Sequence, residues 1–152
     1  MIVRKATRED AALIANFQMA MALETEQLIL EPGIVDSGVK AVFDDPSRGN
    51  YYVAEKNGEV IGSLLTTFEW SDWRNGTVLW IQSVYVLPQY RRHGAYRNMY
   101  GYLQEMVLND STLRGIRLYA DISNTPAHLT YLKMGMNADH YQTFEWIKPI
   151  EN

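Results

Sequence analysis

The stretch VYVLPQYRRHGAYRNMYGYL, Val84 to Leu103, decides which fold the sequence predicts. An apolar run ends at Pro88, basic residues 91–93 crowd against Gly94, and a helical pattern begins at once. Backbone N–H groups at the start of a helix lack partners within it and carry the positive end of the helix dipole. Because glycine lets a ligand approach the main chain closely, this corner predicts a site for phosphate or pyrophosphate.

The plainer alternative is a surface loop that happens to carry three basic residues. The strand-loop-helix context favours anion binding. The corner is not a P-loop, because no Gly-Lys-Ser/Thr follows, and it lacks the three spaced glycines of a dinucleotide-binding fingerprint.

Composition narrows the class of protein. The 152 residues, 47% hydrophobic and 21% charged, suit one soluble domain over residues 1–152. The net charge of −4 argues against nucleic-acid binding, and the absence of Cys excludes disulfides and thiolate chemistry. No apolar run approaches the ~20 residues of a membrane span, and the charged N-terminus is no secretion signal. We therefore expect a cytoplasmic protein that binds neither membrane nor nucleic acid.

Periodicity predicts a mixed α/β chain. Thr7 and Asp10 suggest a capping box, and Asn57-Gly58 and Arg74-Asn75-Gly76 mark hairpin turns. We expect helices over 8–26, 35–43, 95–108 and 124–135, and strands over 2–6, 51–55, 60–70, 77–87, 116–122 and, in one or two pieces, 138–150. These elements predict a mostly antiparallel mixed sheet with helices on both faces and one late β-α-β crossover.

Two segments resemble a known family. Residues 84–100 resemble the acetyl-coenzyme A signature of the GNAT superfamily of N-acetyltransferases, which is a strand, then Gln/Arg-x-x-Gly-x-Gly/Ala, then a helix. Arg91 and Gly94 match this signature, and Tyr96 stands where the family usually has Gly or Ala.

The second segment, NTPAHLTYLKMGM, resembles the family's Asn-x-x-Ala-x-x-x-Tyr-x-x-x-Gly-Phe pattern, with Met136 in place of Phe. The positions that fit are Asn124, Ala127, Tyr131 and Gly135. The resemblance implies the acyl-coenzyme A N-acyltransferase fold, with acetyl-coenzyme A as co-substrate.

The resemblance also implies where acetyl-coenzyme A binds. The strands 81–87 and 116–122 should splay apart around the pantetheine arm, and a β-bulge at Gln82-Ser83 is the expected device. Main-chain contacts to the acetyl group and pantetheine fall at Val84, Tyr85 and Val86. Pyrophosphate donors fall at Arg91, Arg92, His93, Gly94, Ala95 and Tyr96.

Tyr131 matches the family's general acid, which gives a proton to the departing thiolate. The structural alternative is a core aromatic on a short helix. Asn124 is either a cofactor contact or only the cap of that helix.

An ammonium group must lose a proton before it attacks a thioester, and a carboxylate is suited to remove it. The candidate base is Glu69. The alternative is that Glu69 is only a solvated residue at the end of a hairpin. Candidate acceptor-binding residues are Glu24, Glu26, Trp70 and Asp72, because carboxylates and aromatic faces suit a cationic amine. The structural alternative places Glu24 and Glu26 on the polar face of a helix. In the same alternative, Trp70 and Trp73 only cap the sheet.

The sequence thus predicts transfer of an acetyl group from acetyl-coenzyme A to a primary amine, by direct attack in a ternary complex. The acceptor is a small molecule or a protein amine, and a homodimer is an assembly that the family often forms. Two rivals stay open: a non-catalytic acyl-coenzyme A sensor, and an interaction module with an exposed apolar patch around Trp70 and Trp73. His93, His128 and His140 show no ligand spacing, so we predict no metal site.

Overall fold

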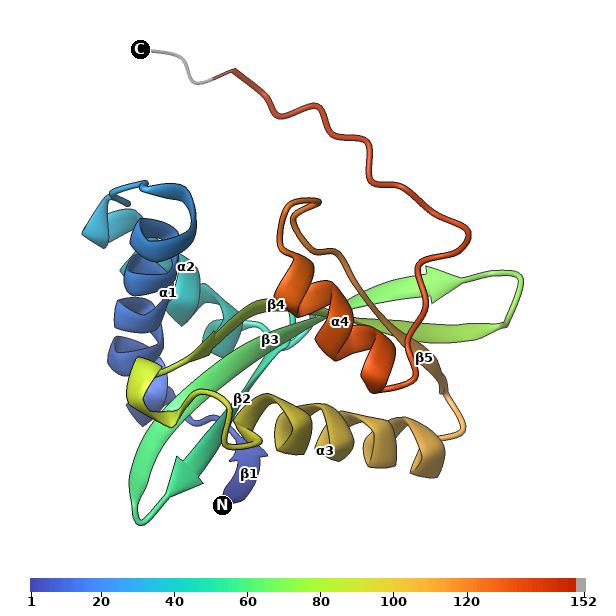
Figure 1. Cartoon of the computed structure of the whole chain (residues 1–152), viewed down its shortest axis with the longest axis horizontal. Coiled ribbons are helices and arrows are strands. Elements are labelled where there is room, and N and C mark those ends of the chain that lie inside the picture. Colours follow the sequence, from blue (N-terminus) through green and yellow to red (C-terminus); the bar gives the residue numbers. More distant parts are fainter. Residues whose placement is uncertain (150–152) are drawn as a thin grey trace. The chain divides into compact units, whose positions relative to one another are not determined.

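The computed structural model describes residues 1–149 (Figure 1). The chain divides into two compact units, residues 1–118 and residues 119–152, and each is described by itself. The expectation of a single domain over 1–152 therefore stays a prediction. The strands are β1 Ile2–Lys5, β2 Asn50–Lys56, β3 Glu59–Ser71, β4 Gly76–Val86 and β5 Leu113–Leu118. The α-helices are α1 Ala11–Glu26, α2 Pro32–Asp44, α3 Ala95–Asn109 and α4 Thr125–Lys133, and short 3-10 helices cover Arg8–Asp10 and Pro88–Tyr90.

The first unit is built on one sheet with the strand order β1-β2-β3-β4-β5. Neighbouring strands are antiparallel except β4 and β5, which are parallel and connected through α3. The predicted mixed, mostly antiparallel sheet is confirmed.

Two adjacent tyrosines of β2 show how the helices cover the sheet, because successive side chains of a strand point to opposite faces. The ring of Tyr51 lies 5.6 Å from that of Phe43 in α2. The ring of Tyr52 lies 5.6 Å from that of Tyr102 in α3. The helices α1 and α2 therefore pack on one face and α3 on the other, as Figure 1 shows and as the sequence predicted.

Local signals placed most boundaries correctly. The capping box is present, with the Thr7 N–H donating to the Asp10 carboxylate at 2.8 Å. Both Asn57 and Gly58 have positive φ, as a two-residue hairpin turn of type I′ requires. Asn75, in the turn between β3 and β4, also has positive φ.

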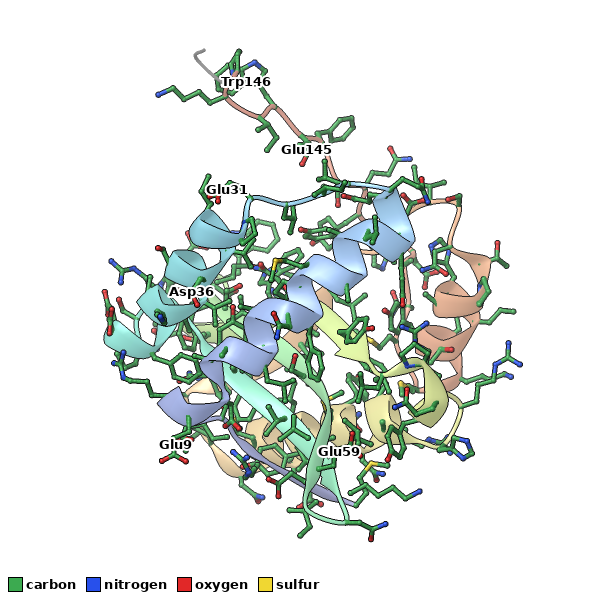
Figure 2. All side chains as sticks on the ribbon, turned by 90° about the vertical axis from the view of Figure 1, so that its left-hand side faces the viewer. Glu9, Glu31, Asp36, Glu59, Glu145 and Trp146 are labelled. Carbon is green, nitrogen blue, oxygen red and sulfur yellow. The ribbon has the colours of Figure 1, made fainter. Side chains whose placement is uncertain are left out.

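The start of α2 was predicted at Val35 and is corrected to Pro32. The Glu31 carboxylate accepts hydrogen bonds from the N–H groups of Gly33 and Ile34, at 3.0 and 2.8 Å, and so caps the helix. Pro32 takes the first helical position, where its missing N–H costs nothing. The EPG stretch, predicted to break α1, thus starts α2, and Figure 2 shows Glu31 at that point.

The strand predicted over 116–122 is corrected to Leu113–Leu118. The chain after β5 turns instead, because the Asp121 carboxylate accepts the N–H of Ser123 at 2.8 Å. The Asp121 carbonyl also accepts the N–H of Asn124 at 3.0 Å. Such local hydrogen bonds compete with strand pairing.

The strands predicted over 138–150 are also corrected, since residues 138–149 form no strand; Ile150 lies outside the described residues. Strand propensity in this segment meets no partner strand in the described chain, and a strand needs one to satisfy its backbone groups. Within residues 119–149 only α4 is regular, and Gly135, with φ of 88°, follows its end. No helix within residues 1–149 is long and apolar enough to cross a membrane.

Candidate coenzyme A and acyl-transfer site

A β-bulge interrupts β4 where the sequence predicted one. Leu65 of β3 pairs with Gln82, whereas Ser63 pairs with Tyr85, so two residue steps on β3 oppose three on β4. Ser83 has φ of 55°, a left-handed conformation that is uncommon for a residue with a side chain. The extra residue bends β4 and re-aims the main chain that follows it.

The bulge lies just beyond the point where β4 and β5 stop pairing. Ile81 and Leu118 form their last pair, after which β4 continues to Val86 beside β3 alone. The edge of β4 over residues 82–86 therefore has no strand beside it in the described chain. The main-chain groups on this edge therefore make no hydrogen bonds to β5.

The start of α3 follows within ten residues and offers main-chain donors. Gly94 is the N-cap with φ of 86°, and no side chain caps the helix. The first intrahelical bond runs from the Asn98 N–H to the Gly94 carbonyl at 2.9 Å, so the N–H groups of residues 95–97 have no acceptor within the helix. A Cβ built at Gly94 meets only the Asn98 side chain, at 3.9 Å, so the approach is open.

Arg92 adds a second left-handed residue, with φ of 64°. Successive N–H groups in such a turn form a concavity that binds anions. Together with the helix dipole of α3, this favours a diphosphate at the loop 91–96. Diphosphate binding at this corner stays a prediction.

The Arg91 side chain contacts the end of β4 and helix α1 in this structure. Its Nε donates to the Val86 carbonyl at 2.8 Å, and its Nη2 lies 2.8 Å from the Glu24 carboxylate of α1. Its guanidinium carbon lies 5.4 Å from the centre of the Tyr85 ring, which in turn contacts Phe17 of α1. Arg91 thus ties α1 to the end of β4. Sequence reasoning missed this contact because Glu24 and Arg91 stand 67 residues apart.

Glu69 belongs to a polar cluster that crosses three strands. Its carboxylate accepts from Trp80 Nε1 at 2.8 Å, and both of its oxygens lie 2.7 Å from Arg117 Nη1. The hydrogen bonds from Arg117 and then Trp80 stabilise the anion and lower the pKa of the Glu69 carboxyl. Glu69 is therefore ionised at neutral pH.

The cluster around Glu69 lies on the same sheet as the bulge but at a distance from it. Glu69 stands four residues from Leu65, which pairs with Gln82, and four residues of a strand span about 13 Å. A proton that leaves an amine at the bulge therefore reaches Glu69 only through intervening water or polar side chains. Gln82, which donates to Thr67 Oγ1 at 2.7 Å, lies between the two.

Comparison with known proteins decides the family. The model of the acetyltransferase (GNAT) family matches residues 18–136, which include β4, its bulge, the loop 91–96 and α3. The chain belongs to this family. GNAT membership makes the protein an acyltransferase whose co-substrate is an acyl-coenzyme A.

Solved structures agree with the GNAT assignment. A possible acetyltransferase from Clostridium difficile 630 is 36% identical, with a TM-score of 0.91 over 98% of both chains. The ribosomal-protein-alanine N-acetyltransferase from Brucella melitensis biovar Abortus 2308 is 14% identical, with a TM-score of 0.78 over 97% of this chain and 99% of that one. AAC(6')-Iy, solved with the bisubstrate analogue CoA-S-monomethyl-acetylneamine, is 12% identical, with a TM-score of 0.76 over 97% and 98%. No curated protein matches the sequence significantly.

Two predicted GNAT site residues belong to the second unit and are described within it. Asn124 caps α4, since its side-chain oxygen accepts the Ala127 N–H at 3.3 Å. Burial raises the pKa of the Tyr131 phenol above its ordinary value of 10, so this hydroxyl keeps its proton at neutral pH. Their contact with the co-substrate stays a prediction.

The predicted acceptor residues of this GNAT protein do not all converge. Trp70 follows Glu69 directly in β3, so the two side chains point to opposite faces of the sheet. Trp70 and Trp73 are 64% and 90% exposed, which is the exposure that the interaction-module alternative requires. Glu26 and Asp72 are exposed, and Glu24 engages Arg91. The described residues hold no group of three or more side chains suited to a metal ion.

Proposed function

We propose that the protein transfers the acetyl group of acetyl-coenzyme A to a primary amine by direct attack in a ternary complex. The observation that carries the proposal is the bulge at Ser83, where β4 leaves β5, followed by the glycine-capped start of α3. These two features supply main-chain groups for an extended pantetheine arm and for a diphosphate. Both features support the proposal that this part of the chain binds the pantetheine arm and the diphosphate of a nucleotide thioester.

The reacting thioester lies, in this proposal, beside Val84, Tyr85 and Val86. Main-chain N–H groups on the open edge of β4 stabilise the negative charge that develops on the carbonyl oxygen. The amine nitrogen bonds to the carbonyl carbon, the carbon–sulfur bond breaks, and the thiolate takes a proton from Tyr131. With no Cys in the chain, no acetyl-cysteine intermediate forms.

The proposed base is Glu69, acting through water. Because contacts with Arg117 and Trp80 lower the pKa of the Glu69 carboxyl, it is charged and able to accept a proton across the neutral range. The same contacts make Glu69 a weaker base, so its expected contribution to the rate lies at the low end for a general base.

The acceptor is a small-molecule or protein amine that carries positive charge. Four side chains, of which three are acidic, stay candidates for single contacts with the acceptor, although they do not all converge: Glu24, Glu26, Trp70 and Asp72. We also propose that the protein acts in the cytoplasm.

The proposed function is tested by thiol release. We expect free coenzyme A to appear only when acetyl-coenzyme A and an amine are both present. In a ternary-complex mechanism the thioester is cleaved only by the bound amine. A panel of amino acids, polyamines, aminoglycosides and peptides provides the amines. If calorimetry shows acetyl-coenzyme A binding but no amine supports release, the sensor alternative replaces the enzyme.

Glu69→Gln is expected to lower kcat/KM at pH 7 by about tenfold to hundredfold, the range of a water-mediated base. The defect should shrink as the pH rises towards the amine's pKa of about 10, because the free amine then needs no base. Initial rates from pH 7 to 9.5 measure the ratio, and Glu105→Gln on α3 is the control. A ratio that stays constant with pH assigns Glu69 to holding Trp80 and Arg117 instead.

A further inference from the structure

The Arg91 side chain lies against the part of β4 that we propose binds the pantetheine arm. Its Nε donates to the Val86 carbonyl at 2.8 Å, and its guanidinium carbon lies 5.4 Å from the centre of the Tyr85 ring. Its Nη2 lies 2.8 Å from the Glu24 carboxylate of α1. Three contacts thus hold one guanidinium group at the end of β4.

The Val86 carbonyl points away from β3. In an antiparallel pair of strands, hydrogen-bonded and non-hydrogen-bonded positions alternate. The Leu87 N–H donates to the Ile61 carbonyl at 2.8 Å, so the next pair, Gly62 with Val86, is of the non-hydrogen-bonded kind. The Val86 carbonyl therefore belongs to the edge of β4 beyond its last pair with β5. Arg91 occupies there an acceptor that suits an amide N–H of the pantetheine arm.

Tyr85 connects this contact to the core. Its ring lies 5.1 Å from the ring of Phe17 in α1. Burial, and then the charge of Glu24, raise the pKa of the Tyr85 phenol, whereas Arg91 lowers it. Both charged side chains therefore lie close to the Tyr85 hydroxyl, and movement of Arg91 changes the contacts of β4 and α1 together.

The contacts of Arg91 are weak enough to be exchanged. The side chains of Arg91 and Glu24 are 42% and 39% exposed. Exposed ion pairs contribute little, because water screens them and because holding two long side chains in one geometry costs entropy. A guanidinium forms charge-assisted, often bidentate hydrogen bonds with phosphate. A diphosphate at the loop 91–96, of which Arg91 is the first residue, therefore competes well with Glu24.

We propose that Arg91 closes the pantetheine edge of β4 in the free protein and that the co-substrate opens it. On binding, the guanidinium leaves Val86 and Glu24 and moves to the diphosphate, and the pantetheine arm takes the Val86 carbonyl. The inference rests on the proposed function, because it needs the pantetheine arm beside residues 84–86. It adds that Glu24 opposes co-substrate binding.

The first experiment measures the Kd of coenzyme A by calorimetry. We expect Glu24→Gln to bind about twofold to fivefold more tightly than the wild type, which is the effect of an exposed ion pair that no longer has to be broken. The matched control is Glu59→Gln. Glu59 accepts the hydroxyl of Tyr90 at 2.8 Å, next to Arg91 in the chain, so this variant removes the same charge near the loop without touching Arg91. It should bind nearly as the wild type does.

The second experiment repeats the Glu24 change in an Arg91→Met background. Methionine keeps an unbranched apolar side chain beside Tyr85 but has no guanidinium. Arg91→Met alone should weaken coenzyme A binding, because the bond to the diphosphate is lost. Glu24→Gln should then change the Kd no further, since the two side chains act through their contact. Tighter binding on Glu24→Gln in this background would assign the effect to general loss of negative charge and overturn the proposal.

The third experiment follows the Arg91 side chain directly. Spectra of the ¹⁵N-labelled protein record the arginine Nε–H signals, and the signal of Arg91 is the one that Arg91→Met lacks. We expect this signal to shift on saturation with coenzyme A, because Nε leaves the Val86 carbonyl. The Nε–H signal of Arg4, which donates to Glu55 at 3.1 Å, is the internal control and should stay in place.

Three further results overturn the proposal and leave the proposed function standing. One is equal coenzyme A affinity in the wild type, Glu24→Gln and Glu59→Gln. Another is an Arg91→Met variant that binds coenzyme A as tightly as the wild type. The third is an Arg91 Nε–H signal that does not move at saturation, which means that the guanidinium remains on Val86. If coenzyme A binds none of these proteins, the proposed function itself fails, and this inference fails with it.

Discussion

Replacing Gly94 with valine is expected to weaken acetyl-coenzyme A binding about hundredfold. Gly94 caps α3 with φ of 86° and stands in the middle of the loop that we propose grips the diphosphate. A branched side chain there disfavours the left-handed conformation and covers the main-chain donors of residues 95–97. Loss of one or two charge-assisted hydrogen bonds, each about 1.5–3 kcal/mol, accounts for a change of this size.

The matched control is Gly58→Val in the turn between β2 and β3. Gly58 has φ of 79° and, like Gly94, no protein atom close to its built Cβ. Both variants should lose about 1–2 kcal/mol of stability from the same backbone strain. Calorimetry should show that only Gly94→Val loses acetyl-coenzyme A affinity. Equal affinity in both variants would mean that the diphosphate is held elsewhere.

Tyr131→Phe is expected to lower kcat by about tenfold to hundredfold at pH 7 and to leave the Kd of acetyl-coenzyme A nearly unchanged. A proton donor assists departure of the thiolate at pH values below the thiol pKa of about 8.5, where the free thiolate takes up a proton. Since burial raises the pKa of the Tyr131 phenol above 10, its proton is present over this whole range.

The pH dependence separates an acid from a packing residue. Above pH 8.5 the thiolate leaves without help, so the ratio of wild-type to Tyr131→Phe kcat should fall towards one. A packing defect gives a ratio that does not change with pH. Tyr102→Phe, which removes a phenol from α3, is the control and should keep its kcat at each pH. A large rise in the Kd of the Tyr131 variant would assign this residue to binding instead.

Signals carried by a few neighbouring residues proved the most reliable part of the sequence. Asn57-Gly58 specified its hairpin because both positions require positive φ, which few residues tolerate. Thr7 and Asp10 fixed the start of the first helical region through contacts three residues apart. Gly94 likewise indicated the start of a helix, and the polar pair Gln82-Ser83 marked the bulge within an apolar strand.

Contacts between distant segments could not be read in this way. Glu24 and Arg91 meet only because α1 packs near the end of β4, and no local pattern encodes that packing. Glu69, the candidate base, and Trp70, a candidate acceptor contact, are neighbours in sequence, but strand alternation sends their side chains to opposite faces. The segment 138–149 has strand character without a strand, because pairing depends on an edge that local sequence does not supply.

The claim on which the account rests is that main-chain N–H groups at the start of α3 bind the diphosphate of the co-substrate. Amide spectra of the ¹⁵N-labelled protein, recorded during titration with coenzyme A, measure these groups one by one. If this claim holds, the largest shifts fall on the amides of residues 92–97, with smaller ones along 84–86 of β4. Saturable binding of coenzyme A that leaves the amides of 92–97 unmoved would contradict it.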